Sequence, residues 1–295
     1  MKKVLSVACA LCMTTAMLTG CGSSNNAGTA ATGEAQNSAA ASTTTEQAST
    51  ATDAGTTLIA LITMDSLDQH WVTLNEGAQK AAAELGVTVQ FMAPNTKDDA
   101  QQIECVNNAV SAGAQAIIVA ANGPDAISSA LREASDAGVK LIYVDSPANV
   151  SAEATFSTDN NAAGKTAGEE MKKALADAGV TSGSIGIINV NAATDSCVMR
   201  EEGFRSAFEG TDFELLETQY GEGDAAKSQS IAENYITQGV VGIFGCNEGS
   251  TTGAGNAIKA SGKDNVIGVG FDKSDAILGP VSYTHLRAHE TAANL

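Results

Sequence analysis

Basic residues are scarce in this sequence. Its 295 residues include 16 lysines and arginines against 34 aspartates and glutamates, and the formal net charge is −18 at pH 7. A surface with this excess of negative charge repels the phosphates of nucleic acids and of anionic lipids. We therefore expect no nucleic-acid partner and no electrostatic attachment to a membrane.

Histidine is rarer still. The chain has three histidines, of which only His70 lies outside the C-terminal tail. One histidine cannot build a His-rich metal site, and it supplies the base of a nucleophilic triad in few geometries. The cysteines of the body, Cys105, Cys197 and Cys246, match no metal-ligand spacing. We expect them to be small, half-buried residues, and we expect no metal and no cofactor.

Nucleotide-binding and hydrolase motifs are absent as well. Residues 65–69, after the first predicted strand, contain no glycine and cannot form a dinucleotide-binding turn. Residues 245–249 have the glycine spacing of a nucleophile elbow, but Asn247 stands in the nucleophile's position. Paired aspartates could act as in a glycosidase. We expect the chain not to be an enzyme, and a glycosidase that uses these aspartates is the alternative.

The N-terminus predicts export and anchoring. Lys2 and Lys3 precede residues 4–18, which are apolar or small throughout. This run has the length of a signal-peptide core and is too short to cross a membrane as a stable helix. It ends in LTGC, which resembles the lipobox of bacterial lipoproteins. The resemblance implies cleavage before Cys21 and lipidation of its thiol; an ordinary secretory signal with a chance cysteine is the alternative.

The body of the chain predicts an α/β fold. It follows a low-complexity stretch, residues 22–55, that cannot bury enough apolar surface to fold and is expected to be a flexible linker. Apolar runs of strand length then alternate with helical patterns. The expected strands are 57–64, 87–92, 116–120, 140–144, 184–190, 213–219, 240–245 and 266–271; the expected helices are 71–85, 98–111, 124–137, 160–178, 198–208, 225–237 and 251–261. This alternation is typical of parallel sheets covered by helices on both faces, here in two similar lobes.

Polar residues follow several of the predicted strands. Asp65 and Asp68 come after the first strand, Asp145 after the fourth, and Asn247 and Asp272 after the last two. Ligands of open parallel sheets bind beyond the carboxyl ends of the strands. We therefore expect these side chains to converge on one ligand site.

Several segments resemble the ribose/galactose-type periplasmic binding proteins. They include IALITMDSLDQHWVTLNEGAQKAAAELG, KLIYVDSP, FSTDNNAAGKTAGE, VMREEGFRSAFE, FGCNEGSTTGAGNAIKASG and VIGVGFDKSD, and the resemblance spans residues 57–279. It implies two Rossmann-like lobes with parallel sheets, joined by three hinge strands, that close on a monosaccharide. Thr158 and Asp159 match the first hinge crossing.

The resemblance also implies roles for single residues. Trp71 matches the aromatic residue that stacks on the sugar ring, and Asp145 matches an aspartate that binds hydroxyl groups. Arg200, Asn247 and Asp272 match polar ligands of the second lobe. Three alternatives stay open: Trp71 as a core residue, Arg200 as a surface residue of a helix, and Asp272 as a helix cap.

The sequence departs from the family at two places. Where the family has a segment like Asn-Pro-Phe-Phe, this chain reads DQHW from Asp68 to Trp71, and the usual Asp-Arg pair reads Asp145-Ser146. The cleft becomes more acidic, so we count Asp68 among the ligand-binding residues. These departures argue against ribose itself and leave room for another aldose, an inositol or an amino-sugar.

These observations together predict a monomeric, extracytoplasmic, lipid-anchored receptor. It would capture a monosaccharide or similar polyol and pass it to the permease subunits of an ABC importer. A sensor for signalling or chemotaxis, with a chemoreceptor as its partner, is the alternative, and a glycosidase is less favoured.

The C-terminal tail, residues 280–295, breaks the pattern. Codon for codon, residues 281–291 read as a transposase sequencing-library adapter. We expect this tail to be non-native, to pack little and to complete neither sheet, with the last part of the family's fold missing after Gly279. The expected domains are a lipoprotein signal peptide (1–20), the lipidated cysteine and linker (21–55), an N-terminal lobe (56–159), an incomplete C-terminal lobe (160–279) and the tail.

If Cys21 carries the anchor, the protein expressed in a bacterial host partitions with the membrane fraction. Cys21→Ala should release it or leave an uncleaved precursor, because several acyl chains on one residue hold a protein at a membrane stably. Fractionation and immunoblotting measure this. Wild-type protein found wholly in the soluble extracellular fraction would contradict lipidation.

Overall fold

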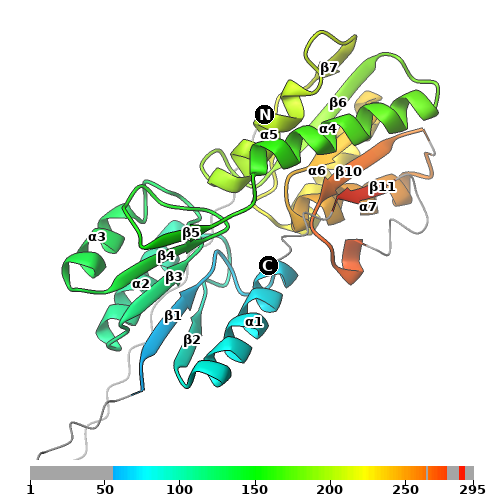
Figure 1. Ribbon diagram of the computed structural model, residues 1–295. Coiled ribbons are helices and arrows are strands. Elements are labelled where there is room, and N and C mark those ends of the chain that lie inside the picture. Colours follow the sequence, from blue (N-terminus) through cyan, green and yellow to red (C-terminus); the bar gives the residue numbers. More distant parts are fainter. Residues whose placement is uncertain (1–55, 264, 278–285, 290–295) are drawn as a thin grey trace, which may run out of the picture. The chain divides into compact units, whose positions relative to one another are not determined.

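The computed structural model describes residues 56–263, 265–277 and 286–289, the last of these as backbone only (Figure 1). The signal segment and linker predicted at residues 1–55 lie outside the described residues. Within the described part, no helix is both long and apolar enough to cross a membrane.

The first lobe is a parallel sheet of five strands in the order β2-β1-β3-β4-β5. Its strands are β1 (Leu58–Ile62), β2 (Thr88–Met92), β3 (Ala116–Val119), β4 (Lys140–Val144) and β5 (Ala154–Phe156). The helices that connect the first four are α1 (Gln69–Leu85), α2 (Asp99–Ser111) and α3 (Ser128–Asp136). Asp68 and Asp98 start α1 and α2, because their carboxylates accept hydrogen bonds from otherwise unpaired N–H groups.

The second lobe repeats this plan. Its sheet has the order β11-β10-β9-β6-β7, with β8 pairing to β6, and every pair is parallel. The strands are β6 (Gly183–Asn189), β7 (Phe213–Leu215), β8 (Gln219–Tyr220), β9 (Gly242–Gly245), β10 (Ile267–Phe271) and β11 (Leu286–His289). The helices are α4 (Asn160–Asp177), α5 (Asp195–Ser206), α6 (Ala225–Gln238) and α7 (Glu248–Ser261). The predicted α/β fold with parallel sheets is confirmed.

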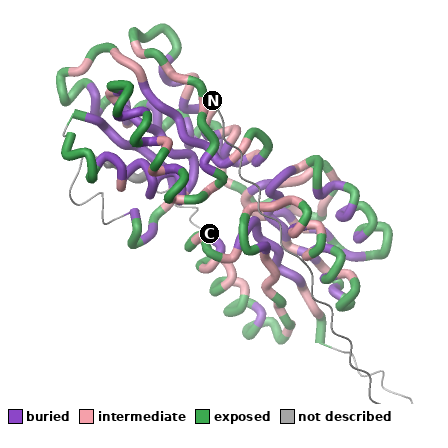
Figure 2. Tube along the Cα trace, turned by 180° about the vertical axis from the view of Figure 1, so that it is seen from behind, coloured by how far each residue is buried: buried purple, intermediate pink, exposed green. Residues whose placement is uncertain are grey.

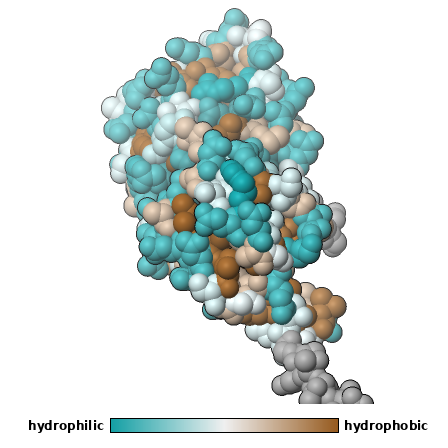
Figure 3. Space-filling view, turned by 90° about the vertical axis from the view of Figure 1, so that its left-hand side faces the viewer, coloured by the Kyte–Doolittle hydropathy of each residue, from teal (hydrophilic) through white to brown (hydrophobic). Residues whose placement is uncertain are grey.

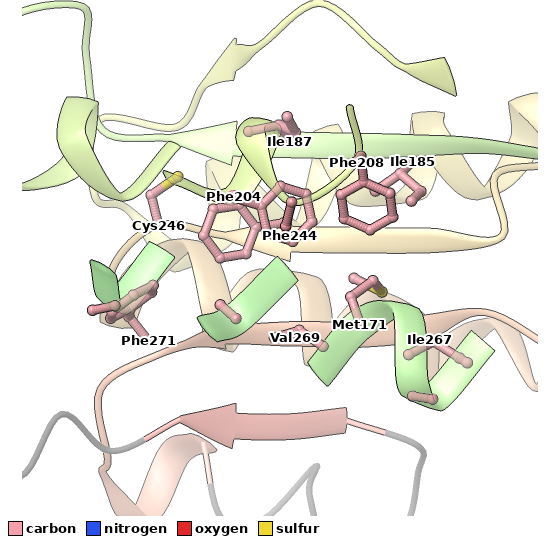
Figure 4. Packing of buried hydrophobic residues seen from close by; sticks show 14 of the residues in the cluster. Met171, Ile185, Ile187, Phe204, Phe208, Phe244, Cys246, Ile267, Val269 and Phe271 are labelled. Carbon is pink, nitrogen blue, oxygen red and sulfur yellow. The ribbon is translucent and has the colours of Figure 1, made fainter. Parts of the chain in front are cut away.

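Each lobe has its own apolar core, seen as the buried strands of Figure 2. In the second lobe, the rings of Phe204 and Phe244 stack with their centroids 4.0 Å apart, and Met171 of α4 belongs to the same cluster (Figure 4). Burying one such side chain stabilises the fold by roughly 1.5–3 kcal/mol. The face shown in Figure 3 is mostly hydrophilic, with hydrophobic residues in small groups.

Several elements differ from the prediction by a few residues, and two of the differences have a clear physical reason. Strand β5 was not predicted, because three residues are too few to show a periodicity, and it is held by pairing with β4. Helix α7 begins at Glu248 instead of residue 251, because Asn247 accepts a hydrogen bond from the backbone N–H of Ser250. The site residue Asn247 is therefore also a helix cap.

The chain crosses between the lobes at residues 157–159. These residues link β5 of the first sheet to α4 of the second lobe. Asp159 caps α4 by accepting a hydrogen bond of 3.0 Å from the backbone N–H of Ala162. Thr158 and Asp159 lie at this crossing, and their role as a hinge stays a prediction.

The tail does pair with a sheet, so the expectation that it completes neither sheet is wrong. Residues Leu286–His289 form β11, which lies parallel to β10 with Gly268 opposite Leu286 (Figure 1). The outer edge of β10 offers unpaired N–H and C=O groups, and such an edge pairs with an extended segment of almost any sequence. The rest of residues 280–295 lies outside the described residues, and the adapter origin of the tail stays a prediction.

Helices α6 and α7 approach each other closely at Gly253. A methyl group added there would lie 2.6 Å from the carbonyl oxygen of Ala225 and from the amide nitrogen of Gln229, which are both backbone atoms of α6. This glycine therefore permits the contact between the two helices. Gly77, in contrast, lies in α1 with nothing within 4 Å of an added methyl group.

We predict opposite effects for the same substitution at these two positions. Gly253→Ala should lower the free energy of unfolding by roughly 1–3 kcal/mol, because backbone must move to make room. Gly77→Ala should raise it by roughly 0.5–1 kcal/mol, because alanine loses less conformational entropy in an exposed helix. Urea denaturation measures both. Equal stability of the two variants would contradict the close helix contact.

Candidate functional site

The six predicted ligand-binding residues line one small cavity to which both lobes contribute. The cavity is lined by Met64, Asp68, His70, Trp71, Lys97 and Asp145 of the first lobe and by Val190, Ser196, Cys197, Arg200, Asn247 and Asp272 of the second. Several of these residues directly follow strands, so the carboxyl ends of both sheets face the same cavity, as the topology predicts. Its free volume is about 20 Å³, which admits a water-sized group and excludes a sugar ring.

Asp145 and Asp272 have an unusual backbone conformation. Their φ angles are 60° and 70°, in the left-handed region that most residues with a side chain avoid. Aspartate tolerates this region better than most residues, at some cost in strain. Such strain concentrates at functional sites, and here it marks the residue after β4 and the residue after β10.

Arg200 is the central cation of the cavity. Its guanidinium group donates from Nε to Asn160 Oδ1 at 2.9 Å and from one terminal nitrogen to the carbonyl of Cys246 at 3.0 Å. It also lies over the ring of Phe271, 4.4 Å from the centroid. The other terminal nitrogen is 3.7 Å from Asp145 Oδ1 in the first lobe. Arg200 is therefore fixed by the second lobe and pairs with the first, which excludes its reading as a surface residue.

The position of Arg200 depends on a close contact between α4 and α5. A methyl group added at Gly164 of α4 would lie 2.0 Å from the carbonyl oxygen of Arg200. Without a side chain at Gly164, α5 comes near enough for Arg200 to reach Asn160 at the start of α4.

Trp71 is a core residue and also lines the cavity, so both roles proposed from the sequence fit its position. It is 4% exposed and packs with Met64 and Ala120, as a core residue would. It also lines the cavity, where the ring of His70 meets it edge-on with centroids 4.6 Å apart. Its indole Nε1 is buried and has no hydrogen-bond partner among the described residues, which is costly unless a ligand or water pairs with it.

Asn247 divides its two roles between the two atoms of its amide. The oxygen Oδ1 caps α7, accepting from the backbone N–H of Ser250 at 3.1 Å and from its hydroxyl at 2.7 Å. The nitrogen Nδ2 is buried without a partner in the described part of the chain. For Asp272 the capping alternative does not hold, because Ser274 Oγ accepts the hydrogen bond from the backbone N–H of Ile277 instead.

Lys97 is a cavity residue that the sequence did not reveal. It follows β2, its side chain is 6% exposed, and its ammonium group pairs closely with Asp65 and at 3.5 Å with Asp68. Burial would raise the pKa of Asp68, but hydrogen bonding with Glu248 and the charge of Lys97 hold it below its usual value. The position of Lys97 after a strand of the first sheet was the available signal. Its charge makes this side of the cleft less acidic than the sequence implied.

The lobes also contact each other through neutral groups. The hydroxyls of Ser146 and Ser196 are 2.8 Å apart, and Thr194 Oγ1 donates to the carbonyl of Asn122 at 2.8 Å. Ser146 additionally donates to Asp145 Oδ2 at 2.8 Å. It thus orients the aspartate with which Arg200 pairs.

The thiols near the cavity are unreactive. Cys105, Cys197 and Cys246 are all free, and the last two are fully buried, more than was predicted, whereas Cys105 is partly exposed as expected. Burial raises the pKa of Cys197 to about 11, so its thiol is protonated and a poor nucleophile at neutral pH. No cluster of three potential metal ligands occurs among the described residues.

Comparison with known proteins assigns the family. Residues 59–279 match the family described as "Periplasmic binding protein domain". The chain is 30% identical over 230 residues to the ribose import binding protein of Haemophilus influenzae, which covers 77% of this chain and 76% of that protein. The chain belongs to the ribose/galactose-type periplasmic binding proteins.

Solved structures agree with this periplasmic binding protein in fold. A carbohydrate transporter solute-binding protein from Agrobacterium radiobacter, in complex with D-arabinose, is 26% identical with a TM-score of 0.75, over 79% of this chain and 81% of that chain. A XylFII–LytSN complex is similar at 25% identity and a TM-score of 0.70, over 76% of this chain and 82% of that chain.

For this binding protein, we predict that Arg200→Met destabilises the fold in a pH-dependent way. Burial raises the pKa of Asp272, and the charge of Arg200 opposes that rise. Removing Arg200 raises the folded-state pKa further above the unfolded value of about 4. Stability is then lost as the pH rises through the folded pKa. The deficit against wild type should be roughly 2–4 kcal/mol at pH 7 and smaller near pH 4.5.

Urea denaturation at the two pH values measures this deficit. Arg132→Met, at an exposed arginine of α3, is the matched control and should change stability by less than about 0.5 kcal/mol at both. A deficit in Arg200→Met that does not change with pH would contradict the pairing of Arg200 with buried carboxylates.

Proposed function

We propose that this chain captures a monosaccharide or similar polyol in the cavity around Arg200 and delivers it to an ABC importer. In this proposal it acts outside the cytoplasm, as periplasmic binding proteins do, and is held at the membrane by the lipid on Cys21. The observation that carries the proposal is a cavity of unpaired donors beside carboxylates: Trp71 Nε1 and Asn247 Nδ2 lack partners, and Asp145 and Asp272 lie beside Arg200.

The chemistry of this cavity suits hydroxyl groups. A sugar hydroxyl donates one hydrogen bond and accepts others, so it can pair with a carboxylate and with an arginine or amide N–H at the same time. Hydrogen bonds to charged groups are stronger than neutral ones and fix orientation. The indole of Trp71 offers an apolar surface for the C–H groups of a sugar ring.

Entry of a sugar requires the lobes to separate. The free volume of about 20 Å³ is too small for a ring, and several contacts hold the lobes together, among them Arg200 with Asp145, Ser146 with Ser196, and Thr194 with Asn122. These are polar contacts, and each can be exchanged for water at small net cost. Hinge opening at residues 157–159 would give access, and closure would bury the ligand between both lobes.

A sensor is the second candidate. It is favoured by the likeness to XylFII, which occurs in a complex with LytSN. In this case the closed, sugar-bound lobes would be recognised by a signalling protein, such as a chemoreceptor, in place of a permease. Genes for a permease and an ATPase beside this one favour the importer, whereas a gene for a kinase favours the sensor.

We predict that Trp71→Ala and Asp145→Ala each weaken sugar binding roughly ten- to hundredfold, because each removes a buried partner of the ligand. A thermal-shift screen over aldoses, inositols and amino-sugars identifies a ligand, since ligand bound to the native state raises its melting temperature. Calorimetry on the hit then gives the affinities.

Tyr220→Ala is the matched control, because Tyr220 is 42% exposed and outside the cavity, and it should bind as wild type does. Unchanged affinity in both cavity variants would place the site elsewhere. Turnover of a glycoside during the same screen would favour the glycosidase.

A further inference from the structure

A second cavity adjoins the first and shares Asp68 and Lys97 with it. Its volume is about 280 Å³, much larger than that of the first. It is lined by Asp65, Leu67, Asp68, Asn95, Thr96 and Lys97 of the first lobe and by Glu222, Gly223, Asp224, Ala225, Glu248, Gly249, Thr252 and Ala276 of the second. None of the aromatic residues of the first cavity reaches it, so a sugar ring stacked on Trp71 would lie beside it.

Two buried polar atoms of this second cavity have no partner. Among the described residues, five buried side-chain nitrogen or oxygen atoms lack a hydrogen bond, and Glu248 Oε2 and Thr252 Oγ1 are two of them. Thr252 is 8% exposed and lies one turn after Glu248 in α7. Both atoms can accept a hydrogen bond from a ligand group that enters the cavity.

The cavity also has more carboxylates than cations. Lys97 is shared between Asp65 and Asp68, and Lys227, from outside the lining, pairs with Glu222 at 2.6 Å. No ion pair of the described residues reaches Glu248. Its carboxyl group instead hydrogen-bonds with that of Asp68 across the lobes, and burial together with Asp68 raises the pKa of Glu248 to about 8. A proton on Glu248 therefore removes one of the two negative charges of the Glu248–Asp68 pair, as a nearby cation would otherwise balance it.

We propose that the second cavity is a subsite for a protonated amine, held by the carboxylates of Asp68 and Glu248 and by the hydroxyl of Thr252. The inference rests on the proposed function, because the amine would belong to the sugar or polyol bound at Trp71 and Arg200. An ammonium group donates three hydrogen bonds, and three acceptors on two lobes match that number. The ligand class is thus an amino-sugar or amino-polyol.

Binding of such a ligand is coupled to loss of the proton from Glu248. The charged and titratable groups near this carboxyl are Asp68 and His70 at the start of α1, Lys97 after β2, Glu222 and Asp224 before α6, and Asp272 after β10. An ammonium group favours the ionised form of Glu248, so amine binding below pH 8 releases a proton. The affinity for an amine of fixed charge therefore increases as the pH rises toward 8, whereas that for a neutral sugar does not.

The test compares ligands that differ only in the amine. D-glucosamine, D-galactosamine and an amino-inositol are measured against their hydroxyl parents and, for the two sugars, their N-acetyl derivatives, by titration calorimetry with the full chain. Buffers of different ionisation enthalpy report the proton released. We expect at least one amine to bind ten- to hundredfold more tightly than its parent, with proton release at pH 7.

Glu248→Gln and Thr252→Val separate the subsite from the sugar site. Glu248→Gln should abolish the proton release and reduce the amine preference at least tenfold, and Thr252→Val should reduce the preference by a smaller factor. Both variants should bind the hydroxyl parent within about twofold of wild type. Glu209→Gln, at an exposed residue beyond α5, is the control and should change neither.

Each outcome decides between the two proposals. Hydroxyl sugars that bind as tightly as their amines, or an amine preference that survives Glu248→Gln, would overturn the subsite and leave the sugar site in place. If no sugar and no amine binds, the proposed function and the subsite both fail.

Discussion

The site depends on one interaction, the pairing of buried Arg200 of the second lobe with Asp145 of the first. An arginine can be buried only if its donors are used. The second lobe uses two of its donor groups, through Asn160 and the carbonyl of Cys246, and the ring of Phe271 covers one face. The remaining donors face Asp145 of the first lobe. The guanidinium group of Arg200 therefore stabilises the second lobe and also provides the positive charge with which Asp145 of the first lobe pairs.

Other local features of the structure make the burial of Arg200 possible. Gly164 lets α5 approach α4, so that Arg200 reaches Asn160. The strained backbone at Asp145 and Asp272 places a carboxylate directly after each of two strands. Because these features lie on different helices and strands, a change to any of them would alter the geometry around the same guanidinium group.

Most of the fold could be predicted from the sequence because its signals are local. Continuous apolar runs such as that of β9 and caps such as Asp98 act within a few residues, and the structure follows them. Strand β5 could not be predicted, because its three residues are held by pairing with β4 and not by their own propensity. The pairing of β11 with β10 was missed for the same reason, since an open sheet edge imposes few demands on the sequence that covers it.

The candidate site was predictable to the extent that it follows strand ends. Asp145, Asn247 and Asp272 each come directly after a strand or one residue later, and topology alone brings them together. Lys97 and Glu248 were missed because their roles depend on their neighbours: Lys97 is paired with Asp65 and Asp68, and Glu248 hydrogen-bonds with Asp68. Such pairings join residues far apart in the chain and have no sequence periodicity.

Asp68 shows why the two parts of the cleft are chemically different. It caps α1 with one carboxylate oxygen, and its other oxygen faces Lys97. On the Arg200 side, the carboxylates of Asp145 and Asp272 lie in the same cavity as the guanidinium group, and the unpaired atoms are the N–H groups of Trp71 and Asn247, which require an acceptor. On the Glu248 side, carboxylates are in excess and the unpaired atoms are oxygens. A ligand that satisfies both sides must offer acceptors at one end and a positively charged donor at the other, and a neutral pentose has no charged donor to offer.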